Sequence, residues 1–99
     1  MPECKLLTSH ALALLCVARD PHSRLRDIAA CLDITERATH RIVSELCEAG
    51  YLSKHRQGSR NFYEVYPNVP LQQPLVAGHN VGEILSPLLE DLDHTQAVA

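Results

Sequence analysis

The chain has 99 residues, which suits one domain, because a second hydrophobic core would leave too little material for the first. Hydrophobic residues make up 45% and charged residues 21%, a balance that excludes collagen-like and wholly disordered chains. With no Trp and one Phe, the core must be aliphatic, and helices suit such a core. The net charge of -3 argues against a basic coat over the whole surface.

Four cysteines occur along the chain: Cys4, Cys16, Cys31 and Cys47. Their spacings match neither a zinc site nor a disulfide framework, so we expect reduced thiols, no metal and no other cofactor. The apolar run over 11–18 is far shorter than the roughly 20 residues that span a bilayer. Arg19, Asp20 and Pro21 follow it directly, which disfavours a signal peptide. The sequence therefore predicts a cytoplasmic chain with no membrane contact.

The first helix is predicted over about 8–19, with Thr8 or Ser9 as its N-cap and Asp20-Pro21 as its end. Its two sides are both apolar. We therefore expect it to pack on its own core and, through Leu12, Cys16 and Val17, on a partner chain.

Two helices follow in close succession. Ser23 is the expected cap of a short helix over 25–32. After the tight connection at Asp33-Ile34, Thr35 should cap a third helix that ends at Ala49 and is closed by Gly50. On this helix a polar stripe lies about 200° from an apolar one, which predicts one buried and one exposed face.

The remainder of the chain predicts a β-hairpin, a connector and a last helix. Strands are expected over 51–56 and 61–66, joined by a turn over 57–60. Three prolines between 67 and 78 indicate an extended connector. An apolar stripe over 81–92 predicts a helix that either kinks at Pro87 or restarts at Ser86, followed by a frayed end.

The order of elements is that of a helix-turn-helix followed by a wing. From Leu25 to Leu52 the sequence resembles the DNA-binding core of winged helix-turn-helix transcriptional regulators of the MarR and ArsR type. The resemblance extends over about 7–66 and implies a mainly α fold with a β-hairpin wing (α+β) and an added C-terminal helix. Residues 1–66 would form the DNA-binding domain, 67–79 a Pro-rich connector and 80–99 a dimerisation helix with a frayed end.

Charge is unevenly distributed, with five bases and two acids over 37–60 but four acids and no Lys or Arg from Pro67 onward. The first block therefore predicts the polyanion surface, because the major groove accepts one helix and is read by donors on its outer face. The wing would reach the backbone or minor groove. The expected DNA-binding residues are Thr35, Arg37, Ala38, His40, Arg41, Ser44, Lys54, Arg56 and Arg60.

Departures from the family pattern concern single positions on or before the third helix. Asp33 replaces a common Gly, which Asp tolerates because it enters the left-handed region readily. Ala38 replaces a common polar residue, and Thr39 takes a half-buried place usually held by an apolar one. Cys47 is either a small boundary residue or a redox-sensing thiol.

The resemblance implies a homodimeric regulator of transcription that binds double-stranded DNA, with two half-sites about 34 Å apart. The rival hypothesis is a winged-helix module for protein interaction that does not bind DNA. No nucleophile-base spacing, phosphate loop or carboxylate pair indicates an enzyme. Alternatively, Arg37 and Arg41 are ordinary solvated residues, with Arg41 paired to Glu45. The sequence names neither the effector nor the operator.

Overall fold

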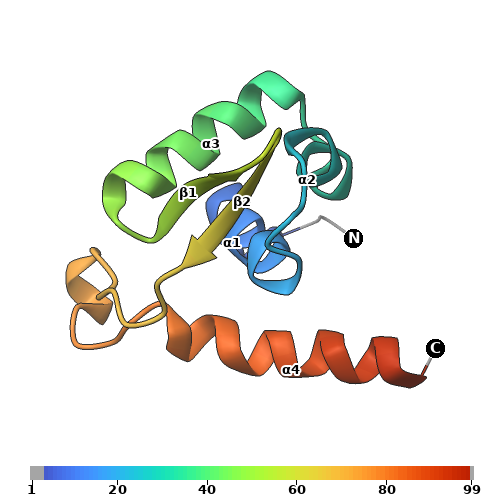
Figure 1. Ribbon diagram of the computed structural model, residues 1–99. Helices are drawn as coiled ribbons and strands as arrows, with labels where there is room; N and C mark the ends of the chain where they lie inside the picture. The colour runs from blue at the N-terminus through green and yellow to red at the C-terminus, as the bar shows by residue number, and fades with distance from the viewer. Residues whose placement is uncertain (1–3, 99) are drawn as a thin grey trace.

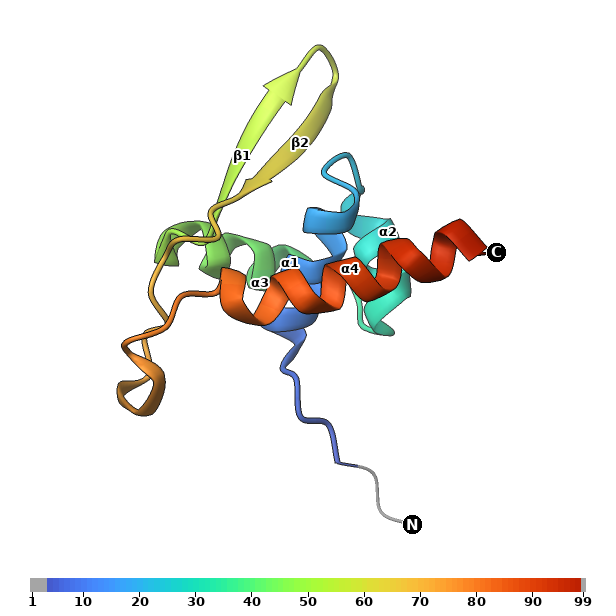
Figure 2. The same cartoon turned by 90° about the horizontal axis from the view of Figure 1, so that it is seen from below.

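We describe the fold from a computed structural model, for residues 4–98, with side chains up to residue 90. In chain order the elements are α1 (Ser9–Arg19), α2 (Leu25–Leu32), α3 (Glu36–Ala49), β1 (Leu52–Gln57), β2 (Arg60–Val65), the 3-10 turn η1 (Pro74–Val76) and α4 (Gly82–Val98). Figure 1 shows α3 and α4 on opposite sides of α1. Figure 2 shows the hairpin of β1 and β2 projecting away from the helices. The predicted winged helix-turn-helix with a C-terminal helix is confirmed.

The core is aliphatic, as the composition predicts, and α1 lies at its centre because it packs against α2, α3, α4 and β2. Ala13 and Val17 of α1 and Ile28 of α2 are fully buried. Thr39 of α3 is also fully buried, rather than half-buried as the family pattern suggests. Its hydroxyl donates to the Thr35 carbonyl at 2.9 Å, so the only polar atom of the side chain is satisfied inside the helix.

Local hydrogen bonds fix the ends of the helix-turn-helix. Thr35 caps α3 as predicted, because its hydroxyl accepts from the Ala38 amide at 3.0 Å. Gly50 ends α3 with φ +89°, and Asp33 adopts the left-handed conformation (φ 57°) in the turn between α2 and α3. The prediction that Ser23 caps α2 is wrong. Ser23 is buried and its hydroxyl donates to the Asp20 carbonyl, while Arg24 occupies the cap position.

The hairpin is an antiparallel pair whose register matches Leu52 with Val65 and Gln57 with Arg60. The strands start and end one residue away from the predicted bounds, because only Gly58 and Ser59 form the turn. Gly58 has φ +63°, which suits the first central residue of a type II′ turn. On its outer edge, β2 is tied to the loop before α2 by a hydrogen bond from the Tyr63 amide to the Pro21 carbonyl at 2.9 Å.

The connector and the last helix differ from their predictions. The connector is not merely extended, because it contains η1 and a bridge between Pro70 and Asn80. Helix α4 runs through Pro87 without restarting, which excludes the restart but not the kink, and it reaches Val98, where a frayed end was expected. Of the described residues, no helix is long and apolar enough to cross a membrane.

Helix α4 packs on α1 within the same chain, and this corrects the expected partner surface. Val17 was expected to face a partner, as was the dimerisation segment 80–99 that includes Val81 and Leu85, but all three side chains are buried in the chain's own core. Leu12 and Ile84 remain 37% and 41% exposed. The apolar surface left over for a partner is therefore smaller than the sequence indicates.

Candidate nucleic-acid interface

The outer face of α3 carries the polar stripe that the sequence predicts. Arg37, His40 and Arg41 are exposed, while Ala38 and Ser44 are half-buried. The opposite face packs into the core through Thr39, Ile42, Val43 and Leu46. Because the apolar face fixes α3 on the core, the hydrogen-bond donors of the stripe point into solvent. The hydroxyl of Thr35, in contrast, is already engaged by the Ala38 amide.

The alternative pairing of Arg41 with Glu45 is not present among the described residues. Glu45 instead contacts the His10 ring of α1, with its Oε1 atom 3.0 Å from Nε2. Both partners are about half exposed, so this contact adds little stability, yet it draws the acid toward α1. The guanidinium of Arg41 is thereby left facing solvent beside Arg37, without a neighbouring carboxylate of its own helix held against it.

The hairpin brings a second set of cations to α3. The register places Lys54 opposite Tyr63 and Arg56 opposite Asn61, on the same face as the buried Leu52. Side chains alternate between the two faces of a strand, so Lys54 and Arg56 share the face that looks toward the helices. A groove of about 300 Å³ between α3 and β1 is lined by Leu25, His40, Val43, Ser44, Cys47, Lys54 and Tyr63.

Arg60 does not belong with Lys54 and Arg56, although the sequence grouped the three together. It pairs with Gln57 on the other face of the hairpin, and its Nη2 atom donates to the His22 carbonyl at 3.1 Å. The ring of Phe62, on the same face, lies 5.8 Å from the ring of His22. Arg60 therefore also anchors the hairpin to the loop between α1 and α2.

A second hollow of about 520 Å³ lies where the starts of α2 and α3 meet the hairpin tip, and Arg60 lines it. It adds four polar residues that the sequence analysis missed: Arg24, Arg26, Ser59 and Asn61. Helix N-termini carry partial positive charge, which reinforces these arginines as an anion-binding surface. Glu36 also lines this hollow and opposes them. The Arg-Leu-Arg sequence at the start of α2 was the available signal, but the charge count began only at Arg37.

A polar cluster covers the outer face of the hairpin. The Ser53 hydroxyl lies 2.8 Å from His55 Nε2 and 2.7 Å from the Tyr66 hydroxyl, and Glu64 lies 3.2 Å from the same Nε2. A catalytic triad needs the acid and the nucleophile on different ring nitrogens. Since both groups share one nitrogen here, the cluster is a cross-strand network and not a nucleophile-base-acid relay.

Cys47 forms part of the wall between α3 and β1 and is half-buried. Burial raises the pKa of the Cys47 thiol, and the nearby Lys54 cation opposes that rise. The side chain is therefore a neutral thiol at neutral pH, which fits the boundary role better than a reactive one. Among the described residues, no three His, Cys, Asp or Glu side chains come together as metal ligands would.

Comparison with known proteins places this geometry in a family. Residues 6–65, which include α1, both helices of the helix-turn-helix and the hairpin, match the winged helix DNA-binding domain. The structure is also similar to that of a mutant of MepR from S. aureus, a MarR-family regulator, with a TM-score of 0.57 and 10% sequence identity. The match covers 94% of this chain and 65% of that chain, so this chain spans about two thirds of the MepR chain.

At this identity the similarity to MepR establishes a shared fold. Comparison with curated protein sequences gives no match. The family match rests on more than half of the chain, including all the elements that form the candidate interface. The chain therefore belongs to the winged helix DNA-binding domain family.

Proposed function

We propose that this chain is a sequence-specific regulator of transcription that binds duplex DNA, with α3 in the major groove and the hairpin on the backbone or minor groove. The observation that carries the proposal is the exposed stripe of Arg37, His40 and Arg41, which continues across a groove to Lys54 on β1. A helix about 10–12 Å across fits a major groove about 12 Å wide. The stripe offers donors where base edges would lie.

The expected contacts fall into two classes. Arg41 and His40, at the middle of the exposed face of α3, are assigned to base edges. Arg37, Lys54 and Arg56 are assigned to phosphates, together with Arg24 and Arg26 at the start of α2, whose helix terminus favours anions. Thr35, Ala38, Ser44 and Arg60 complete the proposed interface, as the resemblance implies.

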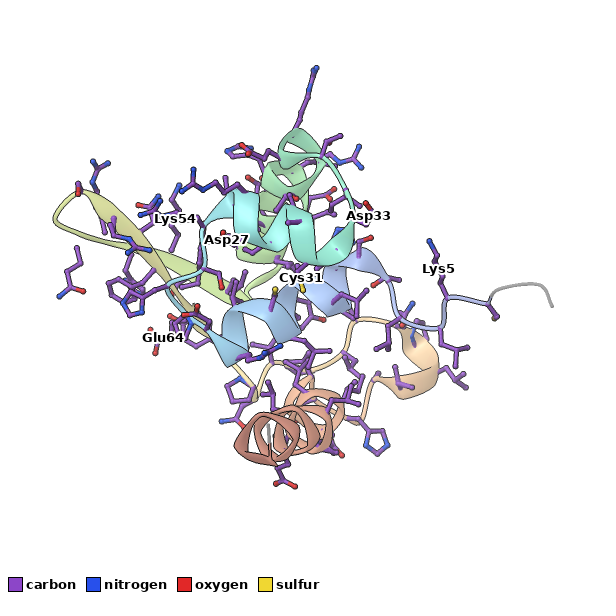
Figure 3. The ribbon with its side chains drawn as sticks, turned by 90° about the vertical axis from the view of Figure 1, so that its right-hand side faces the viewer. Lys5, Asp27, Cys31, Asp33, Lys54 and Glu64 are labelled. Atoms are coloured by element: carbon purple, nitrogen blue, oxygen red, sulfur yellow. The ribbon has the colours of Figure 1, made fainter. Side chains whose placement is uncertain are left out.

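Two lysines provide a matched test of DNA binding. Lys54 and Lys5 are both exposed, and Figure 3 shows them at opposite edges of the molecule. We expect K54A to weaken binding to random duplex DNA and to reduce the slope of log K against log salt by about 1, since one phosphate contact is lost. K5A should leave both quantities unchanged. The measurement is fluorescence anisotropy of labelled duplex over a salt series.

The same titration separates DNA binding from the rival function, a module for protein interaction. No anisotropy change at low salt, with folded protein in excess, would favour the rival. Equal losses in K54A and K5A would indicate diffuse electrostatics without a defined interface. R41A should mainly reduce the preference for a selected sequence over random duplex, by about 1–3 kcal/mol. R56A is the variant to compare with R41A, because Arg56 is assigned to a phosphate. R60A would confound the comparison, since Arg60 also holds the hairpin to His22.

We also propose that the DNA-binding form is a homodimer held by α1 and α4. The apolar side chains available for this contact are Leu12 on α1, Ile84 on α4 and Leu6 and Leu7 before α1. Leu6 is 87% exposed, and apolar surface of this kind is costly to leave in water. A dimer would also supply two recognition helices. The contact area of a single module is too modest to give high affinity alone.

The dimer is tested by charge insertion rather than by truncation, because truncation after Gly78 would remove Val81 and Leu85 from the core. L12E and I84E should shift the mass measured by light scattering, at tens of micromolar, from dimer to monomer without loss of helical signal. L75E is the control, because Leu75 is 96% exposed on η1, outside both helices. A monomeric wild-type chain, or a dimer that survives both substitutions, would contradict the proposal.

A further inference from the structure

Cys16 on α1 and Cys31 on α2 lie side by side, although 14 residues separate them along the chain. The two thiols are close enough to interact, because α1 and α2 pack directly against each other. Figure 3 shows Cys31 on the side of α2 that faces α1. The spacing of the cysteines along the sequence gives no sign of this proximity.

The two thiols differ in their access to solvent. Cys31 is exposed, whereas Cys16 is half-buried against the core. Burial, followed by the Cys31 thiol beside it, raises the pKa of Cys16 to about 11, and the Arg19 cation opposes this rise. A reagent in solution therefore reacts first at Cys31, and Cys16 reacts more slowly unless the group is already attached at Cys31.

We propose that Cys16 and Cys31 form a redox modification site, at which a hydroperoxide oxidises the pair to a reversible disulfide within one chain. The other two cysteines lie outside this contact. Cys4 is exposed ahead of α1, and Cys47 lines the groove between α3 and β1. Among the described cysteines, Cys16 and Cys31 are thus the two that have another sulfur within reach.

The reaction has two steps. The Cys31 sulfur, as its thiolate, attacks one peroxide oxygen; an S–O bond forms, the O–O bond breaks, and an alcohol or water leaves, so that Cys31 becomes a sulfenic acid. The Cys16 sulfur then attacks the Cys31 sulfur; the S–S bond forms, the S–O bond breaks, and water leaves with the Cys16 proton. Two thiols are oxidised and one peroxide is reduced. Contact between the sulfurs compensates for the low thiolate fraction of Cys16.

The bond would connect the last turn of α1 to the last turn of α2. Cys31 lies two residues before Asp33, whose left-handed conformation directs the chain from α2 into α3. A disulfide at this point would fix the end of α2 to α1, next to that turn. The site is thus placed to link the oxidation state to the position of the helix-turn-helix, whichever macromolecule the helix-turn-helix binds.

Mass spectrometry of the full-length chain tests the proposal, and its result does not depend on DNA. Trypsin places the four cysteines in separate peptides: residues 1–5, 6–19, 27–37 and 42–54. After brief exposure to hydrogen peroxide and alkylation of the remaining thiols, we expect peptides 6–19 and 27–37 to appear cross-linked. The cross-link should disappear on treatment with dithiothreitol.

Matched variants identify the bond. C16S and C31S should each abolish the cross-link, and C16S should accumulate the sulfenic acid on Cys31, trapped by dimedone. C4S and C47S, one exposed and one half-buried, should retain the cross-link. A Cys31 to Cys31 dimer between chains, or Cys16 that stays fully alkylatable after unfolding of the oxidised sample, would overturn the proposal. Loss of DNA binding in a separate assay would leave this result unchanged.

Discussion

Thr39 is a fully buried polar side chain on the inner face of α3, and its replacement tests how this helix is held. Its hydroxyl donates to the Thr35 carbonyl at 2.9 Å, but the same carbonyl also accepts from the Thr39 amide at 3.0 Å. T39V therefore removes one donor and leaves no unpaired acceptor. Many hydrogen-bond deletions are costly because they leave a buried polar group without a partner. T39V does not incur this cost.

The magnitude follows from two opposing terms. A neutral hydrogen bond contributes about 1 kcal/mol net, and exchange of the hydroxyl for a buried methyl group returns about 0.8 kcal/mol. T39V should thus change the free energy of unfolding by less than about 1 kcal/mol. T39A also loses the methyl group and leaves a small cavity, partly offset by the better helix propensity of Ala, so we expect it to lose about 1–2 kcal/mol.

Urea unfolding followed by circular dichroism measures both variants, and an unchanged m-value licenses the comparison. T39S completes the set, because it keeps the hydroxyl and removes the methyl group. We expect T39V to be the most stable of the three. If T39S matched the wild type while T39V lost more than about 2 kcal/mol, the hydroxyl would be essential and the reasoning from the shared carbonyl would be refuted.

Three further predictions concern other parts of the chain. Hydrogen bonds from His79 and then from the Asn80 amide lower the pKa of the Glu83 carboxyl below its ordinary value of 4.5. The stability that these bonds contribute should therefore be present above pH 4.5 and be lost as the pH falls through the lowered pKa. E83Q should flatten this loss of stability at acid pH in thermal melts. L85A should cost about 2–5 kcal/mol in urea unfolding, because Leu85 is 3% exposed between α4 and α1. In the folded, reduced chain, iodoacetamide at mildly alkaline pH should label Cys16 more slowly than Cys31, and equal rates would contradict the assigned burial.

The elements that local chemistry decides were predictable from the sequence. The 3.6-residue period of α3 separates Arg41 from Val43, and this period alone identifies the exposed face. Thr35 and Gly50 mark the ends of α3 because an N-cap needs a side-chain acceptor and a left-handed C-cap favours Gly. Asp33 likewise takes the left-handed conformation that its short polar side chain permits.

Helix α4 shows where local rules are insufficient. Pro87 removes a backbone donor, which costs about 3 kcal/mol in a helix interior and predicts either a kink or a restart of the helix. Leu85 before it is buried, and Leu88 and Leu89 after it pack against the core. Each buried Leu contributes about 1.5–3 kcal/mol, so burial on both sides of Pro87 outweighs the lost bond. That balance depends on the packing of α4 against α1. The two helices are far apart in the sequence, so a local sequence pattern does not reveal this contact.

The same limit applies to the candidate interface. The residues of the stripe on α3 are neighbours in sequence, so periodicity groups them. Arg24 and Arg26 meet Arg60 only because the loop before α2 receives hydrogen bonds from the hairpin, through Pro21 and His22. Contacts between distant segments arise from packing, and a charge count along the chain assigns them to different groups or leaves them out.

The net charge of -3 is compatible with DNA binding because the charges are separated in space. Helix α3, which bears Arg37 and Arg41, lies on one side of α1, and α4, which bears Glu83 and Glu90, lies on the other (Figure 1). Coulomb interactions are largely screened beyond about 8–10 Å at physiological salt, so a bound phosphate would experience the nearby arginines far more than the acids of α4. A chain polarised in this way would approach DNA with α3 forward and α4 away from it. The distribution of charge, and not its sum, therefore favours the proposed DNA binding over the rival function.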